Sequence, residues 1–371
     1  MGLNKGFIFC VEFRKRSYFV RAKFSQRVDA ALYPLEPAVV IVGEDAKRFI
    51  HDIFHRLGCP SKTATMVAEH LTDSNLCGME SHGLMRTLQY AEQFQNGYLI
   101  PEAEPCFRKT ERGTYEIDGG GGIGIPSMHL AYDLGMSEAR KDGVTALAIL
   151  NFGHTGRLGA FADHAAEQGF LTIIFGGGNR EKWRQVAPHG GAKAMLPTNP
   201  YCLGIPGGNQ GPVVIDIATS SIAGGWIYAA ESAGALIPEG CLIDREGNPS
   251  RNPRHYFEGG AILPAGKQKG YALALVAEIM AEALLGPSTT EANWLLLVID
   301  CSRYRGSDSM QHAAENVLDE IRNCPPAPEF ERVEIPGERE RNCRKASQGK
   351  IHVPSKTWQQ ILDLKEQLKK P

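Results

Sequence analysis

Two residues near the start of the globular sequence carry the side chains that a carboxylic acid substrate requires. His82 lies in the segment Ser81-His82-Gly83, and Arg86 follows four residues later. If a helix begins at about His82, both side chains project from one face of its first turn. The arginine can then bind a carboxylate through two parallel hydrogen bonds. The imidazole can exchange a hydroxyl proton while hydride leaves the same carbon. A capped helix with a surface His and Arg is the alternative interpretation.

The apolar pattern predicts a helical region followed by an α/β region, because strands and helices alternate after residue 114. We expect a basic terminus at 1–37, a helical region at 38–112, a cofactor-binding α/β domain at 113–324, and a C-terminal segment at 325–371 that packs back on the helical region. The expected strands are 39–42, 115–117, 144–150, 171–175, 213–217 and 295–299, and the expected helices are 44–57, one from Ser61, 84–96, 127–141, 158–168, 271–285 and 355–368.

Composition excludes several classes of protein. A formal charge of -2 over 371 residues gives no broad field for nucleic acid or an anionic membrane. No apolar run approaches the roughly 20 residues that span a bilayer. The nine cysteines include no Cys-x-x-Cys pair, which predicts free thiols in a reducing, cytoplasmic compartment. The first thirty residues hold seven Lys/Arg against two acids, a balance also found in mitochondrial transit peptides.

Two further patterns favour structural interpretations over functional ones. Gly119, Gly121 and Gly124 match the G-x-G-x-x-G dinucleotide fingerprint between a strand and a helix. The ribose-binding acid expected about 20 residues later is missing, so a tight glycine turn is favoured. His51 and His55 have the i, i+4 spacing of a metal-binding pair without a third ligand. We therefore expect an exposed helix face there and no metal site.

Six short motifs occur in one order along the chain, and together they resemble the malate/L-lactate dehydrogenase type 2 family. This family includes ureidoglycolate, sulfolactate and diketogulonate oxidoreductases and cyclic imino-acid reductases. The similarity runs from about Val39 to the last helix. The motifs are Ser81-His82-Gly83 with Arg86, Gly153-His154-Thr155-Gly156, Pro188-His189-Gly190-Gly191, Thr198-Asn199-Pro200, Asp216-Ile217-Ala218-Thr219 and Lys269-Gly270-Tyr271.

The resemblance implies a sulfolactate-dehydrogenase-like fold, with a non-Rossmann mixed sheet beside a helical N- and C-terminal region, usually in a homodimer. It implies NAD or NADP as cofactor. The residues that it places at the cofactor are Asp216, Ile217, Ala218, Lys269, Gly270, Pro336, Gly337 and Glu338. The chemistry is reasonable, since Lys269 lies at a helix start where a cation and the helix N-terminus can meet phosphate together.

Two histidines compete for proton transfer. His82 lies beside the carboxylate-binding Arg86, and the resemblance makes Asp216 its expected partner. His154 follows a buried strand in a glycine-flanked loop, a common position for catalytic groups. We favour His82 as the acid/base and keep His154 as the alternative or as a contact to the substrate hydroxyl. Asn179 is the expected further substrate contact.

The predicted activity is hydride transfer between nicotinamide and C2 of a small 2-hydroxy or 2-oxo carboxylic acid of malate or lactate type. Reduction of a cyclic imino acid such as piperideine-2-carboxylate is the alternative, and a silent nucleotide-binding homologue is a third hypothesis. Trp226, where the family commonly has lysine, and a short 285–294 connection motivate the silent homologue. The retained set of polar site residues argues against it.

Overall fold

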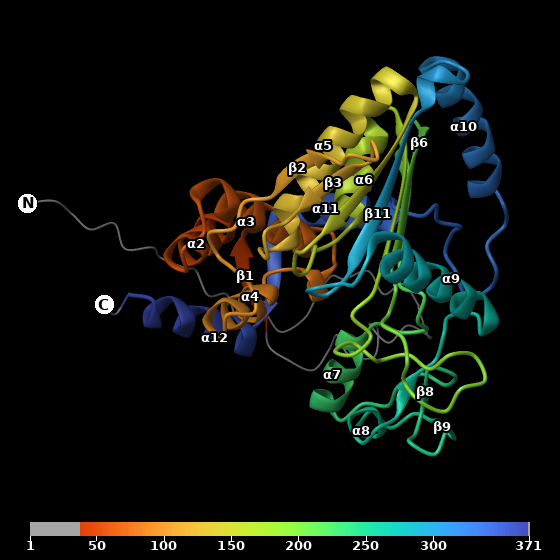
Figure 1. Ribbon diagram of the computed structural model, residues 1–371. Helices are drawn as coiled ribbons and strands as arrows, with labels where there is room; N and C mark the ends of the chain where they lie inside the picture. Colours follow the sequence, from red (N-terminus) through yellow and green to blue (C-terminus); the bar gives the residue numbers. More distant parts are fainter. Residues whose placement is uncertain (1–37, 370–371) are drawn as a thin grey trace, which may run out of the picture.

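The computed structural model describes residues 38–369, and this part of the chain is built around a seven-stranded sheet (Figure 1). Neighbouring strands are antiparallel except β3 and β4, which are parallel. Such a mixed sheet confirms the predicted non-Rossmann α/β fold. The strand order is β2 (Cys106–Lys109), β3 (Tyr115–Asp118), β4 (Val144–Leu150), β11 (Asn293–Asp300), β5 (Phe170–Gly177), β6 (Tyr201–Gly208) and β7 (Gly211–Ile217).

Helices cover both faces of this sheet. On one face lie α5 (Gly124–Asp142) and α6 (Gly159–Glu167), and on the other lies α9 (Gln268–Ile279), which continues as a π-helix over Met280–Leu285. A fourth helix, α10 (Ser307–Arg322), packs on β6.

Alternate residues of a strand point to opposite faces of the sheet, so Thr172 and Gly177 of β5 face different helix layers. Gly177 lies against the backbone of α9, where a Cβ would be 2.7 Å from the Ala277 oxygen.

The N- and C-terminal segments of the described chain form one unit at the side of the sheet (Figure 1). This unit contains β1 (Ala38–Val42), α2 (Gly43–Arg56), α3 (Ser61–Leu76), α4 (Arg86–Gln95), α11 (Glu338–Ser347), β12 (Lys350–Pro354) and α12 (Ser355–Gln367). Strands β1 and β12 pair antiparallel, and α12 contacts α4.

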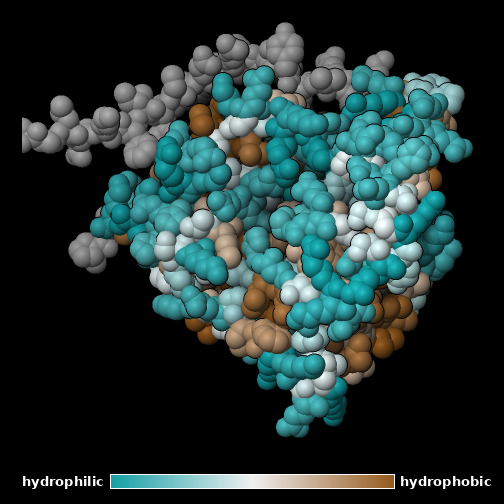
Figure 2. Space-filling model, turned by 90° about the horizontal axis from the view of Figure 1, so that it is seen from above, coloured by the Kyte–Doolittle hydropathy of each residue, from teal (hydrophilic) through white to brown (hydrophobic). Residues whose placement is uncertain are grey.

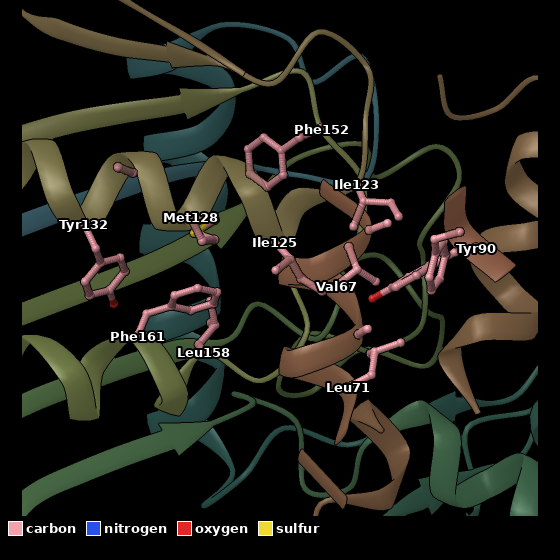
Figure 3. Close-up of a cluster of buried hydrophobic side chains, with 14 of the residues drawn as sticks. Val67, Leu71, Tyr90, Ile123, Ile125, Met128, Tyr132, Phe152, Leu158 and Phe161 are labelled. Carbon is pink, nitrogen blue, oxygen red and sulfur yellow. The ribbon is translucent and has the colours of Figure 1, made fainter. Parts of the chain in front are cut away.

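One hydrophobic core extends from these helices to the sheet. Leu71 of α3 and Tyr90 of α4 belong to the same buried cluster as Ile125 and Phe161. Figure 3 shows Tyr90 reaching from its helix toward the α3 side chains, while Phe161 and Tyr132 lie at the other end of the cluster. This shared core fixes α3 and α4 against the strand ends of the sheet. The boundary at residues 112 and 113 stays a proposal, since the core continues across it.

A small lobe between β7 and α9 has a hydrophobic core of its own. It contains α7 (Gly224–Ala233), β8 (Leu242–Ile243), β9 (Pro249–Ser250), α8 (Arg254–Phe257) and β10 (Ala261–Ile262), and lies at the bottom of Figure 1. Trp226 packs against this core around Ile222 and Ile227. The tryptophan that replaces the family's lysine is therefore a packing residue in this structure.

One face of the molecule is mainly polar (Figure 2). Figure 2 shows one face on which hydrophilic residues cover most of the area and hydrophobic residues gather in patches between them. Within residues 38–369, no helix is both long and apolar enough to cross a membrane. The eight cysteines in this range are free thiols, as predicted for these positions. The basic residues of the 1–37 segment lie outside the described residues.

Candidate active site

The Ser81-His82-Gly83 segment is not the first turn of a helix, which corrects the sequence-based expectation. Residues Glu80–His82 form a separate 3-10 turn, Gly83 is extended, and α4 begins only at Arg86. The Asn75 side chain explains this break. Its Oδ1 accepts the Leu84 N–H at 2.7 Å and occupies the space beside Gly83, where a Cβ would be 2.0 Å away. A larger residue at position 83 would displace the Asn75 side chain that holds this turn, and α4 begins after it.

The structure brings His82 and His154 together. Their rings stack with centroids 5.4 Å apart and an angle of 27° between the planes. His82 comes from the 3-10 turn before α4, and His154 comes from the loop between β4 and α6. Both side chains are partly solvent-accessible although protein surrounds them. Two partly accessible imidazoles in contact with each other are suited to proton exchange with a bound small molecule.

Hydrogen bonds on one nitrogen fix the tautomer of His154. The Gly156 N–H donates to His154 Nδ1 at 3.2 Å, and the Tyr90 hydroxyl lies 2.7 Å from the same atom. Because Nδ1 accepts a backbone N–H, the proton of the neutral ring is assigned to Nε2. Burial, with the charge of Arg86, lowers the pKa of His154 well below its ordinary value. His154 is therefore a neutral hydrogen-bond donor through Nε2.

His82 has the complementary arrangement. Its Nδ1 lies 3.0 Å from the Ser81 hydroxyl, which can accept as well as donate. With the proton on Nδ1, the Nε2 lone pair of His82 is available to take a proton from a substrate. Burial, together with the charges of Arg86 and Arg157, lowers the pKa of His82 to about 3. The neutral ring is thus the resting form of this candidate base.

Arg86 is held beside the histidine pair by its own helix start. Its Nε donates to the Ser81 carbonyl at 2.6 Å, and Nη1 donates to the Gln89 side chain. The guanidinium remains partly exposed, and its charge lowers the pKa of both His82 and His154. A fixed, accessible guanidinium next to two neutral imidazoles can orient a carboxylate.

Sequence reasoning missed two residues that hold this arrangement. Tyr90 follows Arg86 by four positions, so helical spacing could have placed it on the same face. His70 carries no such signal. Its Nε2 accepts the Arg157 N–H at 2.9 Å, and its ring stacks on Phe161 with centroids 5.0 Å apart. A Cβ on Gly156, whose φ is +71°, would be 2.2 Å from His70 Nε2. His70 thus anchors the loop that carries His154.

Acid should destabilise the fold through His70, because burial beside Arg157 lowers its pKa to about 3. The folded value lies below the ordinary 6.5, so the unfolded chain binds more protons between these values. Stability is then full above about pH 6.5 and falls toward pH 3, by up to about 1.4 kcal/mol for each pH unit.

Urea unfolding between pH 7.5 and pH 5 measures this effect. His70→Gln should be less stable at pH 7.5 yet lose less further stability on acidification. His51→Gln, at a partly exposed position of α2, is the control and should keep the wild-type slope. An unchanged slope in His70→Gln would contradict the prediction.

Asp216 lies elsewhere than expected from the resemblance. Its carboxylate accepts the Gly159 N–H at 2.7 Å and so caps the start of α6, close to the Arg157 side chain. The expected bond between Asp216 and His82 is not formed in the described structure, where His82 bonds to Ser81 instead. The Asp216 carboxylate bonds to the start of α6 because the first N–H groups of a helix have no acceptor within the helix.

The other residues expected at the cofactor meet around β7. Ile217 and Ala218 continue that strand at its exposed end. The start of α9 packs directly on the next residue, since a Cβ on Gly270 would be 2.4 Å from the Thr219 oxygen. Lys269 is exposed at this helix start. The Pro336 carbonyl accepts the Val214 N–H at 3.1 Å, which brings the 336–338 turn to the same strand.

Glu338 and Asn179, which were expected to contact the cofactor and the substrate, bond to other residues of the protein in this structure. Glu338 is buried and pairs with Arg322 at 2.9 Å. The Asn179 side-chain amide donates to the Thr290 carbonyl, and its backbone N–H donates to Glu282 at 3.2 Å. Asn179 therefore holds the loop before β11 in this structure.

The glycine fingerprint forms a turn that supports the His154 loop. Gly119 packs against this loop, and a Cβ there would be 2.5 Å from Phe152 Cβ. The Gly124 N–H at the start of α5 donates to the His154 carbonyl at 3.1 Å. The N-terminal N–H group of α5, which a Rossmann site would offer to phosphate, is thus bonded to the backbone of the His154 loop.

Within residues 38–369, no cluster of three or more His, Cys, Asp or Glu side chains could hold a metal ion.

A cavity of about 250 Å³ is lined by residues other than the histidine pair. Its lining includes Arg108, Glu116, Asp118 and Asn151 but neither His82, His154 nor Arg86. We base the candidate site on the histidine geometry, because the chemistry-bearing side chains converge there and not in this cavity.

A mixed-sheet α/β fold with paired histidines and a partly exposed arginine fits an oxidoreductase of hydroxy acids. The comparisons agree with this class. The family model of malate/L-lactate dehydrogenase matches residues 41–362, so the chain belongs to this family. It is an oxidoreductase that acts on hydroxy acids, and the family implies a nicotinamide cofactor.

Individual relatives support this assignment. The chain is 31% identical to hydroxycarboxylate dehydrogenase B of Escherichia coli K12, over 87% of this chain and 92% of that protein. It is 30% identical to a Delta(1)-pyrroline-2-carboxylate/Delta(1)-piperideine-2-carboxylate reductase of Pseudomonas putida, over 74% and 83%. The solved sulfolactate dehydrogenase of Methanocaldococcus jannaschii is similar with a TM-score of 0.79 and 30% identity, over 89% of this chain and 97% of that one.

Proposed function

We propose that this protein transfers hydride between nicotinamide and C2 of a small 2-hydroxy or 2-oxo carboxylic acid of malate or lactate type. The observation that carries the proposal is the stacked His82–His154 pair beside Arg86. We assign the His82 proton to Nδ1, with the Ser81 hydroxyl as acceptor. The two rings then have complementary free nitrogens, a lone pair on His82 and an N–H on His154. A C2 hydroxyl needs both, one to take its proton and one to bind its oxygen.

Each residue then has a defined task. Arg86 binds the substrate carboxylate through its accessible guanidinium edge. Nε2 of His154 donates a hydrogen bond to the C2 oxygen, and Nε2 of His82 takes or returns the hydroxyl proton. Burial lowers the pKa of His82 most, and the Arg86 charge lowers it further, so a carboxylate on Arg86 would raise that pKa by offsetting the second cause. Substrate binding would therefore strengthen the base where it is needed.

The residues around β7 fit a dinucleotide. The start of α9 presents Lys269 beside the exposed end of that strand, and Gly270 lets this helix start approach the strand closely. A lysine at a helix N-terminus is a suitable phosphate site. Asp216, Ile217, Ala218 and the Pro336-Gly337-Glu338 turn complete the proposed cofactor region. When bound, NAD or NADP supplies or accepts the hydride.

Assembly and location belong to the same proposal. Val276, Ile279 and Leu284 are exposed along α9 and its π-helical continuation, and a second copy of the chain would cover this apolar surface in a homodimer. Sedimentation analysis measures the mass of the assembly, and so the proposed homodimer.

Free thiols at Cys59, Cys202 and the other described cysteines fit a reducing, cytoplasmic compartment.

A panel of 2-oxo acids with NADH and NADPH tests the proposed reaction, with reduced-cofactor absorbance as the readout. Oxidation of the cofactor by pyruvate-like or oxaloacetate-like acids is expected. Cofactor binding without turnover on any acid would contradict the proposal and favour a silent homologue.

A further inference from the structure

The motif Thr198-Asn199-Pro200 lies immediately before β6 and bonds to the proposed cofactor region. The Thr198 carbonyl accepts the Thr219 N–H at 3.0 Å and the Thr219 hydroxyl at 2.9 Å. The Thr219 carbonyl in turn accepts the Ala265 N–H at 2.8 Å, in the turn that leads into α9. The segment before β6 is thus joined to the residues that follow β7 and to the turn before α9.

Two further bonds from this segment reach α9 itself. Asn199 Nδ2 donates to Glu278 Oε1 at 2.5 Å, and the Tyr201 hydroxyl donates to the Leu273 carbonyl at 2.9 Å. Asn199 is fully buried, and Glu278 is only 4% exposed. A carboxylate at such a place is costly unless it is hydrogen-bonded, so the amide of Asn199 is a partner that Glu278 needs.

The Glu278 carboxylate also binds the end of β5. Its Oε1 accepts the Gly178 N–H at 3.0 Å, and its Oε2 lies 3.3 Å from Arg180 Nε. Asn199 suits its own place, because its φ of +40° lies in the left-handed region, which asparagine adopts more readily than most residues. One carboxylate thus joins α9, the end of β5 and the segment before β6.

The side of α9 that faces the sheet offers little apolar packing. Its buried residues are Gly270, Ala274, Ala277 and Glu278. Glycine and alanine bury little apolar area, so the hydrogen bonds of Glu278 set where the helix lies on the sheet. Lys269 precedes Glu278 by nine residues, about 14 Å along a helix axis. A shift at the Glu278 end of the helix therefore moves the end that carries Lys269.

We propose that Asn199 and Glu278 are a positioning pair for the cofactor site, which holds the N-terminal turn of α9 beside the end of β7. The inference rests on the proposed function, which assigns Lys269 and Gly270 of that turn to a cofactor phosphate. The pair is buried and acts through the helix. Its loss should weaken cofactor binding and leave proton transfer at the histidine pair unchanged.

Calorimetry on the full chain with NADH and NADPH tests the pair. Asn199→Asp places a second carboxylate against Glu278 and should raise the Kd of the cofactor about tenfold. Steady-state kinetics at saturating cofactor should give a kcat within about twofold of wild type. Glu278→Gln keeps the shape of the side chain, and combined with Asn199→Asp it supplies a donor to the new carboxylate. This double variant should regain part of the lost affinity. Glu167→Gln, exposed on α6, is the matched control and should bind as wild type.

Thermal unfolding shows which variants are folded. If Asn199→Asp does not fold, Asn199→Gly takes its place, because glycine keeps the left-handed backbone while the amide is removed. The same tenfold loss of cofactor affinity is expected for it.

The outcomes separate this inference from the proposed function. An unchanged cofactor Kd in the Asn199 variants, no recovery in the double variant, or a fall in kcat as large as the loss of affinity would each overturn the positioning pair. Binding of neither cofactor by the wild type would overturn the pair and the proposed function together. Only the proposed function fails if the wild type binds cofactor and no 2-oxo acid or cyclic imine oxidises it.

Discussion

Replacing His82 with glutamine should lower kcat by about 10²- to 10⁴-fold, the usual contribution of a positioned acid or base. With the Ser81 hydroxyl accepting a hydrogen bond from Nδ1, the ring offers a free Nε2 lone pair. A glutamine amide can occupy the space but cannot exchange a proton near neutral pH. Stopped-flow absorbance of the reduced nicotinamide measures the hydride-transfer step directly.

His154→Gln is the comparison that separates the two histidines. Its amide N–H can still donate to the C2 oxygen, so we expect a smaller loss, about 10-fold. Tyr90→Phe removes the hydroxyl at 2.7 Å from His154 Nδ1 and should fall in the same range. Near-normal turnover in His82→Gln, with a large loss in His154→Gln, would reverse the roles proposed for the two rings.

Loss of the Arg86 charge should lower kcat/KM by about 100-fold, mainly through a higher KM. The guanidinium is fixed by Ser81 and Gln89, so its carboxylate-binding edge is oriented before the substrate arrives. Arg86→Gln removes the charge, and Arg86→Lys keeps it without the planar fork, so lysine should recover only part of the loss. Steady-state kinetics with a 2-oxo acid measures both.

Arg245→Gln is the matched control for this prediction. Arg245 is exposed in the small lobe and pairs only with its neighbour Glu246 among the contacts described for its side chain. Its removal should leave KM unchanged. A KM in Arg86→Gln equal to that of wild type would show that the substrate carboxylate binds elsewhere.

Local sequence patterns predicted the regular elements well where apolar residues are dense. The strand at 144–150 has the bounds expected, and the helix expected at 355–368 forms over Ser355–Gln367. β6 was missed because Pro206 and three glycines interrupt its apolar pattern. The start of α4 was misplaced for a different reason. The break depends on Asn75, a residue of the previous helix, and no local pattern contains that contact.

The motifs predicted which residues belong to the candidate site, but they did not predict the contacts between these residues. The order of the motifs along the chain identified His82, Arg86 and His154 as site residues through the family resemblance. The structure then shows that the rings of the two histidines are in contact. His70 carries no recognisable spacing, because it reaches the loop of His154 through tertiary packing of α3. The partner of Asp216 was missed for the same reason, since it is a backbone N–H at the start of another helix.

Transfer of a labelled hydride tests the proposed reaction most directly. The protein is incubated with a 2-oxo acid and reduced cofactor that carries deuterium on the transferring face of nicotinamide C4, and mass spectrometry locates the label in the product. We predict one deuterium at C2 of the 2-hydroxy acid, with the signal lost in His82→Gln. A bound cofactor that keeps its deuterium in the presence of every 2-oxo acid and cyclic imine tried would contradict the proposed function.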